Sequence, residues 1–208
     1  MNVLVACERF GAVRDAFRAM GHSAWSCDLD EDASEAPGTR YHLRMDAIDA
    51  INIGGWDLMI AFPPCTYLCS SGLHWNTRRP DRAIKTVEAL AFVRSLMAAD
   101  IPQIAIENPR GCIGTQIRRA DQVIQPYQFG ADASKETHLW LKGLAPLAHG
   151  VTVAGRQVTR ADGRTVARWA NQTDSGQNKL GPSTMRAAER GRTYQGIATA
   201  MAEQWGTK

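Results

Sequence analysis

Residues 2–30 read NVLVACERFGAVRDAFRAMGHSAWSCDLD and contain two apolar runs separated by an amphipathic stretch. Residues 2–7 form a short apolar run with two valines, which predicts a buried strand. In residues 11–20 apolar side chains recur at i, i+3, i+4 and i+7, the spacing of one helix face, and Gly21 ends the pattern. Residues 23–27 are a second predicted strand. This order of strand, helix and strand predicts a β-α-β unit of an α/β protein.

The rest of the chain continues the alternation of strands and helices. Further strands are predicted at residues 41–43, 56–62, 102–106, 122–125 and 137–141. A helix begins at Pro80, and Ala83, Val87, Leu90, Val93 and Met97 give it an apolar stripe. A second helix, residues 197–205, closes the chain. We interpret the polar, Ser/Gly-bearing stretch 66–79 as a mobile loop. The pattern as a whole predicts an α/β domain with a mainly parallel sheet.

The composition is that of one globular domain. The chain has 208 residues, of which 44% are hydrophobic and 22% charged, and its formal net charge is +3. These values exclude global disorder, and no apolar run approaches the ~20 residues that span a bilayer. Five irregularly spaced cysteines and the lack of a secretory pattern favour a reduced, cytoplasmic protein without a membrane partner. The cysteines and histidines show no paired zinc-ligand spacing, so we expect no metal.

Polar and reactive residues follow the predicted strands. Ligands of parallel α/β sheets bind outside the carboxyl ends of the strands, where these residues would gather along one edge. They are Glu8, Asp28, Asp46, Pro64–Cys65 and Glu107–Asn108. The sequence therefore predicts an active site at this edge.

The sharpest local signal is Phe62-Pro63-Pro64-Cys65, at the end of a predicted strand. Two prolines hold the cysteine at the edge of the sheet, where its thiolate would be the strongest nucleophile of the chain. The alternative is a small buried apolar side chain. Glu107-Asn108-Pro109 ends the next strand, and adjacent strands lie ~4.8 Å apart, so Glu107 is expected close to Cys65. There its carboxyl would hold a substrate and handle a proton.

These motifs resemble those of the DNA (cytosine-5) methyltransferases. Residues 63–72, PPCTYLCSSG, are similar to the family's Pro-Cys nucleophile loop, and Glu107-Asn108-Pro109 is similar to its Glu-Asn-Val/Pro motif. Residues 135–140, which follow a Phe-Gly, and the terminal stretch 192–198, RTYQGIA, resemble the short phage- and prophage-associated members. The resemblance covers most of residues 1–142 and 192–206.

The resemblance implies a Rossmann-like, S-adenosylmethionine-dependent methyltransferase fold with a seven-stranded sheet. Cys65 would add to carbon 6 of cytosine, and Glu107 would hydrogen-bond ring nitrogen 3 and the exocyclic amine. Pro64 and Asn108 complete the implied catalytic motifs. The implied contacts to S-adenosylmethionine come from Cys7, Glu8, Gly11, Asp28, Asp30, Asp46 and Pro63. The expected setting is the cytoplasm of a bacterial or phage-infected cell, with DNA as partner.

Residues 144–191 stand where the family carries a much larger target-recognition domain. Residues 150–192 contain eight Lys/Arg and three Asp/Glu. We therefore interpret residues 144–191 as a small basic insertion within a single catalytic domain, 1–208. This insertion would bind phosphate and be partly disordered without DNA. The alternative is a solvated loop. The expected substrate contacts are Ser70, Ser71, Lys135, Thr137, Arg156, Arg160 and Arg164. So small an insertion predicts a short or relaxed target sequence.

Three departures from the family keep alternatives open. The first glycine-rich loop retains only Gly11, and the Gln-x-Arg-x-Arg strand and the terminal Gly-Asn-Ser-Val are absent. One alternative is modification of single-stranded DNA or free cytidine nucleotides at carbon 5. Another is a catalytically silent protein of the same fold that binds DNA or cofactor.

Overall fold

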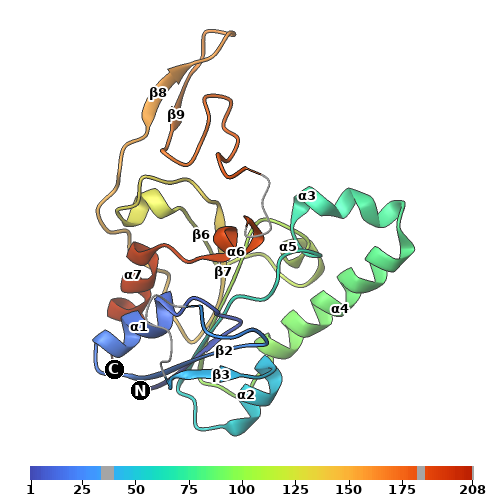
Figure 1. Cartoon of the computed structure of the whole chain (residues 1–208), viewed down its shortest axis with the longest axis vertical. Helices are drawn as coiled ribbons and strands as arrows, with labels where there is room; N and C mark the ends of the chain where they lie inside the picture. Colours follow the sequence, from blue (N-terminus) through green and yellow to red (C-terminus); the bar gives the residue numbers. More distant parts are fainter. Residues whose placement is uncertain (34–39, 182–185, 208) are drawn as a thin grey trace.

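The computed structural model describes residues 1–33, 40–181 and 186–207 (Figure 1). The strands are β1 (Asn2–Ala6), β2 (Ser23–Asp28), β3 (His42–Arg44), β4 (Leu58–Ala61), β5 (Gln103–Asn108), β6 (Gln122–Ile124), β7 (Thr137–Lys142), β8 (Arg156–Thr159) and β9 (Thr165–Arg168). The helices are α1 (Ala12–Ala19), α2 (Ala47–Ile53), α3 (Ser70–Leu73), α4 (Pro80–Met97), α5 (Ile113–Gln116), α6 (Arg186–Gly191) and α7 (Gln195–Trp205), with 3-10 turns η1 (His74–Thr77) and η2 (Pro126–Phe129).

A central sheet organises the molecule. It has seven strands in the order β3-β2-β1-β4-β5-β7-β6. The neighbours from β3 to β5 pair in parallel, and β7 runs antiparallel to both β5 and β6. The predicted fold class, a mainly parallel seven-stranded sheet flanked by helices, is confirmed in its architecture.

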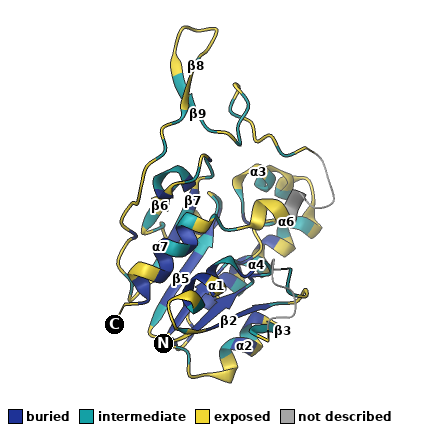
Figure 2. Cartoon of the chain, turned by 60° about the vertical axis from the view of Figure 1, so that its left-hand side comes forward, coloured by how far each residue is buried: buried dark blue, intermediate teal, exposed yellow. Residues whose placement is uncertain are grey.

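Helices cover both faces of this sheet. On one face α1 and α7 bury Phe17, Ile197 and Met201 against β1 and β4. On the other face α2 and the last half of α4 form a second apolar cluster, in which Leu90 and Val93 are buried. Figure 2 shows the sheet as a buried layer between partly exposed helices. Because β1 and β4 are covered twice, their sequences are apolar without alternation.

Helix α4 begins at Pro80, as predicted, but its apolar stripe is only partly buried. Val87 is 65% exposed and Ile84 is 61% exposed, whereas Leu90 and Val93 lie in the core. The first half of α4 projects beyond the edge of the sheet, which Figure 1 shows on the right. The predicted burial of Val87 is therefore wrong, because helical spacing cannot show where the sheet beneath a helix ends.

The prediction of a mobile loop at residues 66–79 is also wrong. This stretch contains α3 and η1, and side chains of α4 hold its backbone. Arg82 Nη2 donates to Thr66 O at 2.6 Å, and its Nε donates to Gly72 O at 3.1 Å. The Thr86 hydroxyl donates to Tyr67 O at 3.0 Å. These partners lie ten or more residues away, so the local composition gives no sign of them.

Strands β8 and β9 form a separate two-stranded hairpin within residues 144–191. It projects from the end of the molecule that carries η2, at the top of Figure 1. Among the helices of the described ranges, none combines the length and the apolar character needed to cross a bilayer.

Candidate active site

The predicted nucleophile and its carboxyl partner follow neighbouring parallel strands. In the register of β4 and β5, Ala61 pairs with Ile106, so Phe62 and Glu107 come next at the same edge of the sheet. Cys65 follows Pro63 and Pro64 and is exposed. Glu107 is close enough to Cys65 to raise the pKa of the thiol electrostatically. Cys65 and Glu107 therefore follow neighbouring strands at the same edge of the sheet.

The two motifs are joined directly by Asn108. Its Nδ2 donates to the carbonyl oxygen of Pro63 at 2.7 Å, and the residue is 1% exposed. Pro63 is itself buried. Since a buried donor that loses its partner is costly, this hydrogen bond fixes the start of the cysteine loop against the end of β5.

A second connection lies a few residues further along both loops. Cys69 and Gly111 form an isolated antiparallel bridge, and Cys112 N donates to Leu68 O at 2.8 Å. A Cβ on Gly111 would lie 1.9 Å from Leu68 O, so only glycine permits this approach. The loop that carries Cys65 is thus held at both ends by the segment that follows Glu107.

Charged groups of both signs surround the Cys65 thiol. Desolvation by the surrounding protein raises its pKa, and Cys69 and Glu107 raise it further, although the outer side of the residue is exposed. Lys135 and Arg190 oppose this rise. Since the thiolate is the nucleophile, these two cations are the groups that favour the reactive form.

Burial also raises the pKa of Glu107, whose side chain is 13% exposed. Lys135 Nζ lies 3.9 Å from Glu107 Oε1 and, with Thr137 and His138, opposes the rise. A carboxyl with a raised pKa has a larger protonated fraction near neutral pH. Glu107 can therefore act as a hydrogen-bond donor as well as an acceptor.

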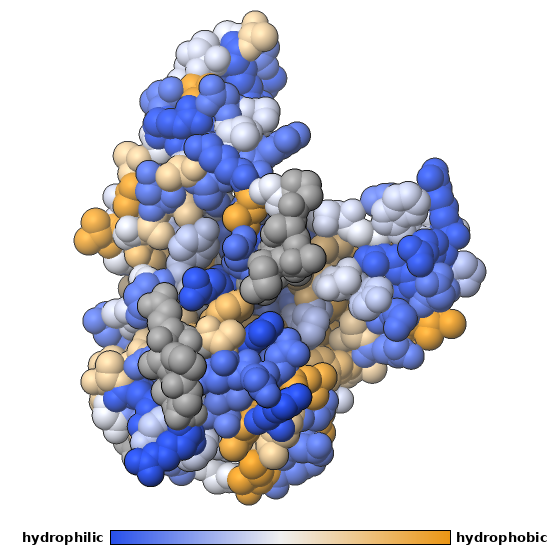
Figure 3. All heavy atoms as spheres, viewed as in Figure 1, coloured by the Kyte–Doolittle hydropathy of each residue, from blue (hydrophilic) through white to orange (hydrophobic). Residues whose placement is uncertain are grey.

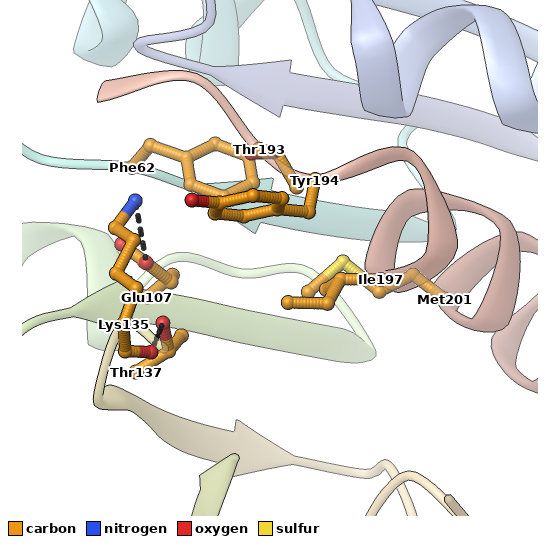
Figure 4. A pocket seen from close by; sticks show the side chains of 8 residues that line it. All are labelled: Phe62, Glu107, Lys135, Thr137, Thr193, Tyr194, Ile197 and Met201. Carbon is orange, nitrogen blue, oxygen red and sulfur yellow. Dashed lines mark hydrogen bonds and ion pairs between the residues drawn. The ribbon is translucent and has the colours of Figure 1, made fainter. Parts of the chain in front are cut away.

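Glu107 and Lys135 line a pocket that the closing helix completes (Figure 4). Tyr194 and Thr193 face them from the segment before α7. The other lining residues are Phe62, Thr137, Ile197 and Met201. The pocket therefore has a polar side on β5 and β7 and an apolar and aromatic side on β4 and α7.

Three of the expected cofactor-binding residues gather at the ends of the first strands. Cys7, directly after β1, has a φ of 58°, which is unusual for a residue other than glycine. Burial raises the pKa of its thiol, and Cys27, Asp28 and Asp46 raise it further by their charges. Cys7, Asp28 and Asp46 therefore lie together.

Glu8 has a structural role that the sequence pattern does not predict. Its Oε1 accepts from Val13 N at 2.6 Å and its Oε2 accepts from Arg14 N at 3.2 Å, so the carboxyl caps the N-terminus of α1. The residue is 6% exposed, and desolvation raises its pKa to about 7 despite both hydrogen bonds. Gly11 precedes the helix with a φ of 68°, where a Cβ would meet the Arg14 guanidinium.

Two of the acids expected to contact S-adenosylmethionine, Asp46 and Asp30, have partners within the protein. Asp46 Oδ1 accepts from Ile48 N at 2.8 Å and caps α2, while Asp30 Oδ2 lies 3.3 Å from Arg9 Nη1. Both acids are exposed, and Asp28 is half-buried. Carboxylates at the ends of neighbouring strands accept hydrogen bonds from the hydroxyls and amine of a nucleoside, so this set of acceptors fits S-adenosylmethionine. The carboxyl of Glu8 is already bound to helix N–H groups.

The expected DNA contacts fall into separate groups. Lys135 and Thr137 line the pocket, and Ser70 and Ser71 begin α3 with exposed side chains. Arg156, Arg160 and Arg164 belong to the distant β8–β9 hairpin. Arg156 pairs with Asp174 at 2.6 Å and Arg164 with Asp162 at 2.7 Å. Figure 3 shows a hollow between the part that carries the hairpin and the projecting α3–α4 part, with hydrophilic residues on both sides.

Sequence reasoning missed several residues of this region. Arg190 acts on Cys65 from the short helix α6, and Tyr194 lines the pocket although it belongs to a motif already singled out. Arg82 holds the backbone around Cys65 from α4. Within the described residues, no group of three His, Cys, Asp or Glu side chains is placed to hold a metal ion.

The chain is similar to proteins of known structure. Neither family models nor curated proteins match this sequence. The chain is similar to the crystal structure of a candidate DNA modification methyltransferase encoded within a prophage (E. coli), with 13% identity and a TM-score of 0.42. The match covers 68% of this chain and 46% of that chain, so this chain spans about half of its length.

Proposed function

We propose that this chain is a DNA (cytosine-5) methyltransferase that acts through a covalent adduct between Cys65 and cytosine. One observation carries the proposal: Cys65 and Glu107 follow two neighbouring parallel strands at the same edge of the sheet, and Asn108 joins their loops through a hydrogen bond of 2.7 Å. A nucleophilic thiol beside a carboxyl is the combination that carbon-5 chemistry requires.

Cytosine needs activation because its carbon 5 is a poor nucleophile in the neutral aromatic ring. The Cys65 thiol loses its proton to solvent, helped by Lys135 and Arg190. Its sulfur then forms a bond to carbon 6, and the electron pair of the 5,6 double bond makes carbon 5 nucleophilic. Protonated Glu107 donates a hydrogen bond to ring nitrogen 3, which stabilises the charge that develops during attack.

Asp28 and Asp46, at the ends of the first strands, would hold S-adenosylmethionine, which would supply an electrophilic methyl group to carbon 5. Carbon 5 then carries both the new methyl group and its original proton. Loss of that proton to water restores the 5,6 double bond, and the carbon–sulfur bond breaks so that its electron pair returns to the Cys65 thiolate. The methyl is thereby exchanged for one proton, and the enzyme is regenerated.

DNA provides the context for this chemistry. A cytosine inside a duplex must be flipped out of the stack before a thiol can reach carbon 6, at a cost of a few kcal/mol. The arginines of the β8–β9 hairpin and the hydrophilic residues that border the hollow in Figure 3 suit a phosphate backbone. The small hairpin offers few base contacts, which favours a short or relaxed target sequence.

Transfer of a tritiated methyl group tests this proposal. Purified protein is incubated with labelled S-adenosylmethionine and duplex DNA, and the digested nucleosides are separated. We expect the label in 5-methylcytosine and its loss in Cys65→Ser. Cys69→Ser is the matched control, since this half-buried thiol lies in the same loop, and it should retain activity. Label in methylated adenine or at nitrogen 4 of cytosine would contradict the proposal.

A further inference from the structure

The hairpin is seated on the catalytic domain through a short segment after β9. Trp169 stacks on Tyr127 with ring centroids 4.1 Å apart and an interplanar angle of 9°. Ala170 N donates to Asp132 Oδ1 at 2.9 Å. The strand that leads into the hairpin is tied to the same region, because Val153 N donates to Tyr127 O at 2.8 Å. Both ends of the hairpin therefore rest on residues 127–132.

Asn171 joins the segment after β9 to the catalytic domain through two hydrogen bonds. Its Oδ1 accepts from Ser134 N at 3.0 Å, and its Nδ2 donates to Ser134 O at 2.9 Å. One side-chain amide thus satisfies both backbone groups of Ser134, as a neighbouring strand would. The backbone of Asn171 is held in turn, since Lys179 N donates to its carbonyl oxygen at 2.9 Å.

Ser134 directly precedes the cation of the active site. Lys135 N donates to Gln125 Oε1 at 2.9 Å, which fixes the next peptide group, and Lys135 Nζ lies 3.9 Å from Glu107 Oε1. On the other wall of the pocket, burial raises the pKa of the Tyr194 hydroxyl and the side chain of Asn171 opposes this rise, so the two side chains lie close together. Asn171 therefore hydrogen-bonds Ser134, the residue before Lys135, and lies close to Tyr194, which lines the pocket.

We propose that Asn171 is a positioning residue, which places Lys135 against Glu107 through Ser134 and thereby makes the active site depend on a correctly seated hairpin. Asn171, in the segment after β9, thus links the hairpin that carries the proposed DNA contacts to Ser134, beside Lys135, and so couples binding to chemistry. Its catalytic meaning rests on the function proposed above, whereas the placement of Lys135 can be tested without any reaction.

The first test measures the position of Lys135 through the reactivity of Cys65. The charged groups that act on this thiol are Cys69, Glu107, Lys135 and Arg190. If Asn171→Ala displaces Lys135, the pKa of Cys65 rises, and alkylation by iodoacetamide near pH 7.5 slows about threefold. Lys135→Ala should slow it equally, and the double variant should slow it no further. Asn52→Ala, at an exposed position of α2, is the control.

Peptide mass spectrometry assigns the alkylation to Cys65, and thermal melting shows whether each variant is folded. Asn171→Ser gives a second variant, because a shorter hydroxyl cannot span both backbone groups of Ser134. Unchanged alkylation in folded Asn171→Ala and Asn171→Ser would overturn the inference. If the slowing of alkylation by Asn171→Ala and the slowing by Lys135→Ala multiply in the double variant, the inference is also overturned, since Asn171 would then act on Cys65 by a route other than Lys135.

The second test measures trapping of the wild type and of Asn171→Ala on DNA that contains 5-fluorocytosine. We expect at least tenfold slower adduct formation in the variant, with DNA affinity within about twofold of wild type. An equal rate would overturn the catalytic part of the inference. Failure of the wild type to form any adduct would instead refute the proposed function, and the alkylation series would still show whether Asn171 places Lys135.

Discussion

The side-chain amide of Asn108 donates a 2.7 Å hydrogen bond to the carbonyl oxygen of Pro63, within the buried layer beneath the active site. This bond joins the strand that presents Glu107 to the loop that presents Cys65. The segments that present Cys65 and Glu107 are therefore held together by a contact that is protected from water.

Asn108→Ala should lower the methylation rate by about 10- to 100-fold, because misplacement of a reacting group by a fraction of an ångström has effects of this size. The free energy of unfolding should fall by about 1–3 kcal/mol, since the Pro63 carbonyl loses its buried partner. Methyl transfer and urea denaturation measure the two effects. Asn52→Ala, on the surface of α2, should change neither. Wild-type activity in Asn108→Ala would show that this contact does not position Cys65.

Gly196→Ala should destabilise the protein by about 1–3 kcal/mol. A Cβ at Gly196 would lie 1.8 Å from Phe129 O, so α7 and η2 would have to separate. Gly114→Ala is the matched control in α5, because a Cβ there meets no atom within 4 Å. It should leave stability unchanged or raise it by about 0.5–1 kcal/mol. Urea denaturation compares the two variants, and equal effects would contradict the close approach of α7.

Glu8 predicts a pH dependence of stability. Burial raises its pKa from 4.5 to about 7, so the folded state binds a proton more tightly than the unfolded state. Its contribution to stability is therefore present at low pH and is lost as the pH rises from 4.5 to about 7. Across this window the wild type should lose about 3 kcal/mol more than Glu8→Gln.

Urea denaturation at a series of pH values measures this difference. Glu203→Gln, at an exposed position of α7, controls for the loss of one carboxyl group. A constant difference between wild type and Glu8→Gln from pH 4.5 to 7 would show that folding does not raise the pKa of Glu8.

The hairpin arginines should control the salt dependence of DNA binding. Arg160→Ala should reduce the slope of log K against log salt concentration by about 0.9 if Arg160 contacts one phosphate. Arg156→Ala should reduce it less, because Arg156 already pairs with Asp174 at 2.6 Å. Arg119→Ala removes an exposed arginine outside the hairpin and should leave the slope unchanged. Equal slopes in all variants would place the DNA elsewhere.

Much of the fold could be predicted because its signals are local. Strand β1 and helix α1 follow from the spacing of apolar residues in 2–30, and Pro80 begins α4 as expected. The exposure of Val87 and the helices in 66–79 could not be predicted in the same way. They depend on the extent of the sheet and on hydrogen bonds from Arg82, which a local pattern does not contain.

In the candidate site, too, some features could be predicted from the local sequence and others could not. Cys65 and Glu107 could be predicted together because both follow strands that pair in parallel. The capping role of Glu8 could not, since it depends on the exact turn between β1 and α1. Asn171 was missed because it reaches Ser134 across a long stretch of sequence that has few apolar residues and no periodicity.

Trapping on a duplex that contains 5-fluorocytosine tests the covalent role of Cys65 most directly. Fluorine at carbon 5 cannot leave as a proton does, so the reaction stops after methyl transfer with the protein still attached. We expect a covalent protein–DNA complex that forms with wild type, requires S-adenosylmethionine and is absent with Cys65→Ser. No complex with duplex, single strand or nucleotide, from folded protein that binds the cofactor, would contradict the proposed function.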